Sequence, residues 1–348
     1  MAYTTIDDPT AFHQTKLYTG NDSSRAITFD GNTDMQPDWS WFKARSEAYN
    51  HAIFDSVRGV QKLIRSNQTN AEETHSTTLT AFGSNGFSLG GGDAFTNANN
   101  VTYASWHWKA GTSFTNDASS TGIGSIDSAG SVNQDAGFSI ISFAGASAVS
   151  TVAHGLGVAP KMMIFKNRSD ADHWGVYHQS LGSNAAMYLN LSGAVDGTLW
   201  NNTAPTTSVF TVQNNSAVNG SGNNIIAYCF AEKQGYSKFG SYTGNANNDG
   251  PYIHLGFKPA FLVIKQSSSE RNWIMMDAKR SPFNIVTKYM KGNSSSAEET
   301  YNYVDFLSNG FKCRDSDTGA NASGGTYIYY AFAENPFVTS SGVPATAR

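Results

Sequence analysis

Short apolar runs in which every second residue is apolar or aromatic are the main pattern of this chain. Examples are residues 104–108 (ASWHW), 227–232 (AYCFAE) and 330–334 (YAFAE), and turns rich in Asn, Gly and Ser separate such runs. Alternation with a period of two predicts β-strands. The sequence has no apolar run of about 20 residues, the length that crosses a bilayer as a helix. We therefore expect an all-β protein that does not insert into a membrane.

One pattern occurs three times, at residues 37–46 (PDWSWFKARS), 160–169 (PKMMIFKNRS) and 259–268 (PAFLVIKQSS). In each copy a Lys lies six residues after a Pro, apolar residues occupy positions two, four and five, and a Ser closes the segment. A later landmark agrees, because FGSNGF at 82–87 matches FLSNGF at 306–311. This self-similarity indicates a repeat of about 90 to 100 residues.

The size and strand pattern of the repeat predict its fold. Short strands with turns every eight to twelve residues, in a unit of about 100 residues, are typical of an antiparallel β-sandwich or jelly roll. The fold class that we predict is therefore all-β, with three tandem antiparallel β-sandwich repeats that each have their own core. The predicted divisions are an N-terminal arm at 1–15, repeats at 16–110, 138–233 and 236–335, a Gly/Ser/Thr-rich linker at 111–137, and a C-terminal arm at 336–348.

The aromatic residues raise the question of sugar binding, because the chain has 7 Trp, 16 Tyr and 21 Phe. The repeat separates core residues from candidate binding residues. Trp39 corresponds to Met162 in the second repeat, and Trp108 to Phe230. Shared apolarity without shared shape indicates core packing. We expect four Trp residues to belong to the core: Trp39, Trp41, Trp106 and Trp108.

Trp200 is different, because it has no counterpart in the other repeats and stands among turn-forming residues. Its ring either stacks on a ligand or anchors its own loop. Loops that differ between repeats are where binding residues are expected on such a scaffold. The candidate ligand-binding residues are Trp200, Asn201, Asn245, Asn247, Tyr301 and Tyr303.

Lys43, Lys166 and Lys265 occupy the same position in the three repeats. Their side chains form either a binding triad or ordinary strand ends, at which the Lys stem covers apolar surface and the amine stays in water. We favour the second interpretation.

Charge and cysteine content limit the classes of function. Only 14% of residues are charged, the formal net charge is -4, and basic residues do not cluster, which argues against nucleic-acid binding. Cys229 and Cys313 fall at different places in their repeats and form no CxxC pair, so we expect neither a disulfide nor a thiol metal site. The N-terminus lacks the basic and apolar regions of a secretion signal. We expect synthesis in the cytoplasm.

Catalytic and metal-binding motifs are missing from the sequence. It contains no GxSxG, HExxH or GxxxxGK[ST] motif, and the eight His lack metal-ligand spacing. Asp55 and Asp277 correspond, but the second repeat has His178 at that position. The acidic loops 30–34 and 315–317 offer oxygen ligands to a structural Ca²⁺, without the full ligand ladder of a calcium loop. We therefore expect no catalytic activity and no cofactor.

The repeat pattern, from Pro-x-aromatic through FxSNGF to the closing YxxYAFAE, resembles a module of structural proteins in tailed phages that infect marine bacteria. The resemblance covers nearly the whole chain, although the second repeat lacks the SNGF motif and has SVFTV at 208–212 instead. It implies a virion component such as a fibre, appendage or surface protein, made in the host cytoplasm. It supplies no catalytic residues.

Three functions agree with these observations. The first is a surface-projecting fibre or appendage that attaches to the host cell surface, with a glycan as the expected receptor, through loops. The second is a capsid or tail decoration or cement protein, and the third is a glycan depolymerase. The expected partners are other virion proteins, a host glycan or receptor, and further copies of the chain, for example as a trimer; nucleic acid is not among them.

Overall fold

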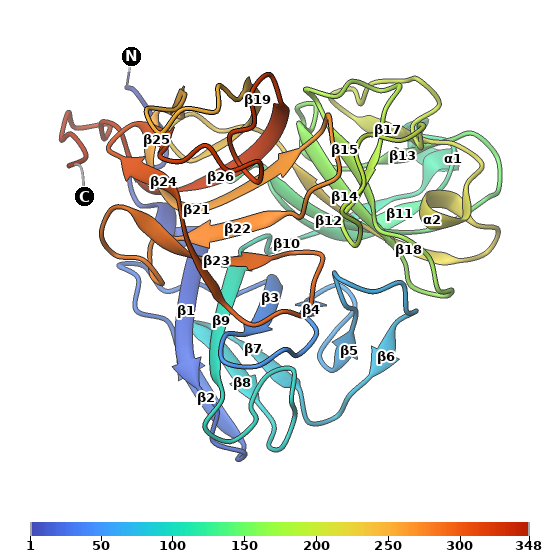
Figure 1. Ribbon diagram of the computed structural model, residues 1–348. Helices are drawn as coiled ribbons and strands as arrows, with labels where there is room; N and C mark the ends of the chain where they lie inside the picture. Colours follow the sequence, from blue (N-terminus) through green and yellow to red (C-terminus); the bar gives the residue numbers. More distant parts are fainter. Residues whose placement is uncertain (1, 347–348) are drawn as a thin grey trace.

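The computed structural model describes residues 2–346 and confirms the all-β class (Figure 1). Within these residues, helix is limited to one 3-10 turn and two four-residue α-helices, and the named strands pair antiparallel. The helical elements are η1 (Pro9–Ala11), α1 (Ala118–Thr121) and α2 (Ser216–Asn219).

The first third of the chain, here called unit 1 (residues 13–110), contains a main sheet of order β1-β9-β3-β4 and a second sheet of order β2-β8-β7. A two-stranded sheet, β5-β6, accompanies them. The strands are β1 (His13–Thr19), β2 (Arg25–Thr28), β3 (Trp39–Ala44), β4 (Ala52–Asp55), β5 (Lys62–Leu63), β6 (Glu73–Thr74), β7 (Leu79–Gly83), β8 (Gly86–Leu89) and β9 (Thr102–Trp108).

Unit 2 (residues 112–230) contains a seven-stranded main sheet of order β10-β11-β12-β18-β14-β15-β16 and a second sheet formed by β13 and β17. Its strands are β10 (Thr112–Asn116), β11 (Ser128–Asn133), β12 (Phe138–Ala144), β13 (Ser150–Ala153), β14 (Met162–Asn167), β15 (Gly175–His178), β16 (Met187–Tyr188), β17 (Val209–Val212) and β18 (Asn224–Phe230).

Unit 3 (residues 237–336) is built on one eight-stranded sheet of order β19-β26-β21-β22-β23-β24-β25-β20. Its strands are β19 (Ser237–Thr243), β20 (Tyr252–His254), β21 (Phe257–Gln266), β22 (Ile274–Asp277), β23 (Val286–Lys291), β24 (Glu299–Leu307), β25 (Gly310–Cys313) and β26 (Thr326–Pro336).

The central strands of the main sheets are buried on both faces. In β14 all six residues are buried. Met162 and Ile164 face a core shared by the units, whereas Met163 and Phe165 face a separate core that they share with Phe210 of β17. Successive side chains of a strand point to opposite faces, so a strand with both faces covered is apolar nearly throughout. This explains the continuous apolar runs in the repeated segments.

The three units share one central core, which differs from the expectation that each repeat has its own. Trp108, Phe230 and Phe332 occupy equivalent positions in the repeat: Trp108 and Phe230 end β9 and β18, whereas β26 continues past Phe332 to Pro336. Their ring centroids form a triangle with sides of 5.4, 5.8 and 6.5 Å. Figure 1 shows the three units arranged around this region. The core assignment of the four Trp residues is confirmed, because each is at most 2% exposed.

The segment 111–137 differs from the predicted linker. It contains β10 and β11, which extend the main sheet of unit 2, because β11 pairs with β12 over five residues. Gly, Ser and Thr here occupy strand positions at a sheet edge, where composition alone does not separate a strand from a flexible linker.

The predicted N-terminal arm also lies against the body of the protein. Tyr3 donates a hydrogen bond to the carbonyl of Gly256, and Ile6 is buried. The C-terminal residues turn back through an isolated bridge between Val338 and Pro344. Ser340 binds the Asp7 carboxylate, so the two chain ends lie together on the side of unit 3.

Candidate functional site

The repeated Lys residues lie inside the protein, which differs from the expected solvated strand ends. Lys43, Lys166 and Lys265 are fully buried. The Lys166 amine donates to the carbonyls of Thr69 (2.9 Å) and Asp172 (2.9 Å), so it joins unit 2 to unit 1. Burial lowers the pKa of each Lys to about 8. These amines hold the structure together and do not form a binding triad open to a ligand.

The Lys265 amine makes the equivalent contact between units 3 and 2, with the carbonyl of Ser192 at 3.1 Å. A second set of contacts follows the same order. Trp174 Nε1 donates to the carbonyl of Arg65 (2.9 Å), and Trp273 Nε1 to that of Tyr188 (3.1 Å). In unit 1 the corresponding residue is His51, whose Nε2 lies 3.0 Å from the carbonyl of Lys291 in unit 3. Unit 2 thus contacts unit 1, unit 3 contacts unit 2, and unit 1 contacts unit 3. The contacts between units form a closed ring.

Partly buried ion pairs connect the units in the same way. The Arg168 guanidinium binds Glu72 at 2.9 and 3.0 Å, which joins units 2 and 1. Arg45 binds Glu298 at the same two distances and joins units 1 and 3. Between units 2 and 3 the position of the carboxylate is occupied by Val195, whose backbone N–H donates to the carbonyl of Ser267.

Asp55, Asp277 and His178 correspond in the repeat, and all three are buried between units. Asp55 accepts from Tyr228 of unit 2 (2.7 Å), and Asp277 accepts from Trp106 of unit 1 (3.1 Å). His178 Nε2 lies 3.1 Å from the carbonyl of Tyr329 in unit 3. Each Asp also pairs with an Arg three residues later. These side chains therefore connect the units.

Alkaline pH should stabilise the protein over a narrow range. Because the folded protein releases the protons of the three buried Lys near pH 8 and the unfolded chain holds them to about pH 10.5, the free energy of unfolding rises between these values. Burial raises the pKa of Cys229 and Cys313, which opposes the rise above about pH 9. We expect a net gain on the order of 3 kcal/mol from pH 7 to 9, measurable by urea unfolding.

The control for this prediction is Lys166→Met, which removes one of the three titrating amines. This variant is expected to be less stable than the wild type at every pH, so the quantity to compare is the pH dependence of stability. The slope of the unfolding free energy against pH should fall by about a third. A wild-type stability that is flat or decreasing between pH 7 and 9 would contradict charged, buried amines at these positions.

The structure places Trp200 in the core of unit 2, with 1% exposure. Its Nε1 donates to the carbonyl of Ala185 (3.0 Å), and its ring contacts Phe165. The ring therefore anchors its loop, and its faces are not open for stacking. Asn201 is exposed in the same turn with φ of 49°, a left-handed conformation that Asn tolerates.

The unit 3 candidates come together at one end of that unit, far along the chain from Trp200. Asn321 Nδ2 binds the Asn245 side chain (3.1 Å), the Asn247 carbonyl (2.9 Å) and the Asp315 carbonyl (2.8 Å). Asp315 in turn accepts from the hydroxyl of Tyr301 at 2.9 Å. We call Asn245, Asn247, Tyr301 and Asp315 the tip of unit 3.

Exposure separates the two Tyr candidates at the tip of unit 3. Tyr301 is 36% exposed, whereas Tyr303 is 7% exposed and supports the Tyr301 ring with a centroid distance of 4.8 Å. The hydrogen bond to Asp315 raises the pKa of Tyr301 to about 12, so its hydroxyl is a neutral donor at physiological pH. The tip therefore presents one aromatic ring beside exposed Asn residues.

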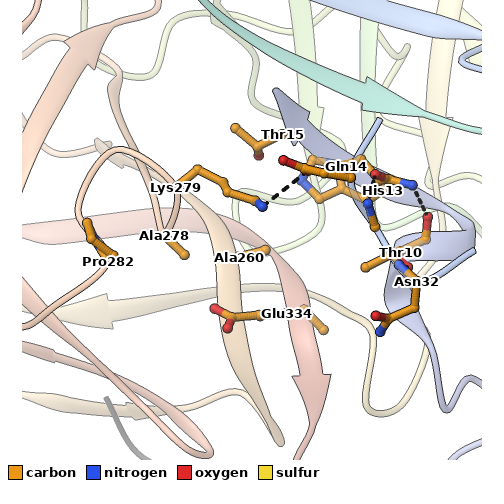
Figure 2. A pocket seen from close by; sticks show the side chains of 13 residues that line it. Thr10, His13, Gln14, Thr15, Asn32, Ala260, Ala278, Lys279, Pro282 and Glu334 are labelled. Atoms are coloured by element: carbon orange, nitrogen blue, oxygen red, sulfur yellow. Dashed lines mark hydrogen bonds and ion pairs between the residues drawn. The ribbon is translucent and has the colours of Figure 1, made fainter. Parts of the chain in front are cut away.

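Sequence reasoning missed a pocket of 330 Å³ between units 1 and 3. His13 and Thr15 of β1 line it from one side, and Ala260 and Glu334 of unit 3 line it from the other (Figure 2). The available signal was weak. On one face of β1, His13 and Thr15 lie opposite Trp108 and Trp106 of β9. Apolar residues would be expected at these two positions of a buried interface.

Two carboxylates line this pocket, namely those of Asp30 and Glu334. Asp30 pairs with Lys16 and Lys279, and these amines hold its pKa below the usual value although burial opposes them. Glu334 pairs with Lys258. A glycosidase acid has a raised pKa, so Asp30 is not arranged as one.

A metal site requires grouped ligand side chains, and a membrane-spanning helix requires length and apolarity. Within residues 2–346, no three His, Cys, Asp or Glu side chains are grouped so that they hold a metal ion. The same residues contain no helix with the length and apolarity to cross a bilayer.

The fold defines this chain as an all-β protein of three interlocked repeat units. It belongs to the family described as a domain of unknown function (DUF7483), whose model matches residues 8–336. No curated protein and no solved structure matches the chain. Because the family match runs through all three units, the interlocked body as a whole, and not the single repeat, corresponds to the family domain.

Proposed function

We propose that this protein is a non-enzymatic virion surface component that attaches to a host-cell glycan through the tip of unit 3. The observation that carries the proposal is that polar residues shared by the repeats and residues that differ between the repeats have different places in the structure. Polar residues shared by the repeats are used for contacts between units, as Lys166 and Asp55 show. Binding is thus left to residues that differ between units, and Tyr301 and Asn247 are such residues beside Asn245, which matches Asn21 of unit 1.

The architecture suits this task. A closed ring of contacts between the units and a shared core hold the three units as one rigid support. A rigid support reduces the entropic cost of binding at an exposed loop. An aromatic ring beside amide groups is a suitable surface for a sugar, since the ring packs on C–H groups and the amides bond to hydroxyls. Many copies on one particle multiply weak contacts by avidity.

The rival decoration function has less support. A cement protein would hold its neighbours through extended terminal arms. Residues 3 to 12 instead pack within the chain: Thr4 binds the carbonyl of Gln234, just before unit 3 (2.8 Å), and η1 contacts β26 of unit 3. Those residues are therefore already engaged within the chain.

Binding of the purified chain to intact cells of candidate bacterial hosts tests the proposal. We expect Tyr301→Ala to weaken binding about tenfold, because an exposed aromatic anchor at the centre of an interface contributes about 1 to 2 kcal/mol. The matched control is Asn201→Gly, an exposed loop change in unit 2 that keeps the left-handed conformation.

Equal binding by Tyr301→Ala and the wild type would remove the tip of unit 3 as the receptor site. Binding to purified capsids or tails, with no binding to cells that the parent particle infects, would overturn attachment and favour the decoration function. Deleting unit 3 is not a suitable test, because the deletion would expose the shared core.

A further inference from the structure

Two residues that line the pocket between units 1 and 3 each have a buried polar side-chain atom that the protein leaves without a partner. Among the described residues, neither His13 Nε2 nor Thr15 Oγ1 has a hydrogen-bond partner. His13 is 3% exposed and Thr15 is 6% exposed, and both line the pocket. A buried polar group without a partner costs about 1 to 3 kcal/mol, so two such groups at one pocket indicate that something else satisfies them.

The proton position on His13 follows from its other nitrogen. Nδ1 lies 3.0 Å from the backbone carbonyl of His107, which only accepts, so Nδ1 carries the proton. Burial among the rings of Trp108, Phe261 and Phe332 lowers the pKa of His13 to about 3. The imidazole is therefore neutral, and Nε2 is an acceptor that needs a donor from the pocket.

The remaining pocket residues define the charge of a suitable ligand. Lys279 extends toward β1 (Figure 2) and binds Asp30 at 3.2 Å, and Glu334 is paired with Lys258. The charges are thus compensated within the protein, so a charged ligand gains no unpaired partner. Ala260, Ala278 and Pro282 give the pocket an apolar wall.

We propose that this pocket binds a single neutral sugar unit. A hydroxyl group donates to His13 Nε2 while a neighbouring hydroxyl exchanges a hydrogen bond with Thr15, and the C–H face of the ring packs on the alanine and proline wall. The volume of 330 Å³ lies at the lower end of the range of about 300 to 1,000 Å³ for ligand pockets, which suits one ring. The site is separate from the tip of unit 3 and independent of the function proposed for it.

Nuclear magnetic resonance of the full chain tests this site, with methyl glycosides of glucose, galactose and mannose as probes. The ¹⁵N resonance of His13 Nε2 should shift on addition of at least one of them, because an unprotonated imidazole nitrogen responds strongly to a new donor. Thr15→Val should weaken that binding about two- to tenfold, the effect of one hydrogen bond. Ala278→Leu, which fills the pocket without a polar change, should abolish it.

The matched control is Thr96→Val. Thr96 is buried in unit 1, its hydroxyl also lacks a partner among the described residues, and it does not line the pocket. If no probe shifts the His13 resonance, the pocket holds water only and the proposal is overturned. Equal effects of Thr15→Val and Thr96→Val on affinity would also overturn it. Loss of cell binding in Tyr301→Ala with intact sugar binding here would separate the two sites.

Discussion

Replacing Asp55 with alanine should destabilise the whole protein by about 3 to 5 kcal/mol, because it removes one partner of a buried ion pair. Arg58 is fully buried and binds Asp55, Glu72 and the carbonyl of Lys62. The change also leaves the buried Tyr228 hydroxyl without its acceptor. Urea unfolding monitored by Trp fluorescence measures the loss. Asp277→Ala in unit 3 should have a similar effect.

The control is Asp249→Ala, which breaks an exposed ion pair with Lys312 and should leave the stability nearly unchanged, because solvent screens such pairs. The shape of the transition tests the shared core. Because Asp55 joins units 1 and 2 around that core, the variant should still unfold in one cooperative step at a lower urea concentration. Separate melting of unit 1, with units 2 and 3 retained, would show that the units are independent domains.

Acidification should unfold the protein cooperatively, with a midpoint between about pH 4.5 and 6. Burial lowers the pKa of His13 and His51 to about 3 and of His178 to about 4, and it also lowers that of His107 and His154. The unfolded chain binds these protons below about pH 6.5, whereas the folded protein takes them up only at lower pH. His13, His51 and His178 therefore lower the stability by about 4 kcal/mol per pH unit, and His107 and His154 act in the same direction.

Near-ultraviolet circular dichroism against pH measures this transition, and the slope of stability against pH gives the number of protons taken up. His254→Gln is the matched control, since His254 is exposed and its replacement should not shift the midpoint. A protein that stays folded at pH 4 would show that the imidazoles are protonated within the fold, which would contradict the hydrogen bond that Trp41 Nε1 donates to His51 Nδ1.

The functional surface could be predicted only in part. The tip of unit 3 followed from the rule that loops differing between repeats are free to bind, and the structure brings Asn245, Asn247 and Tyr301 together, although Asn245 corresponds to Asn21 of unit 1. Trp200 obeyed the same rule and is nevertheless buried. A residue without a counterpart is not always exposed, because unit 2 also has a second core of its own, and Trp200 belongs to it. The pocket at His13 could not be predicted, since its two walls come from different units.

The sequence by itself determined the repeat, the strands of the repeated segments and the four core Trp residues of unit 1, because a period of two and matched apolar positions are local properties of the chain. Only the tertiary structure decided what covers the second face of each main sheet. The contacts that determine this covering join residues far apart in the sequence, such as Arg45 and Glu298. Three amphipathic sheets can bury their remaining apolar faces separately or against one another, and the same residue pattern allows both. The closed ring of buried contacts, which no single repeat contains, selects the second arrangement.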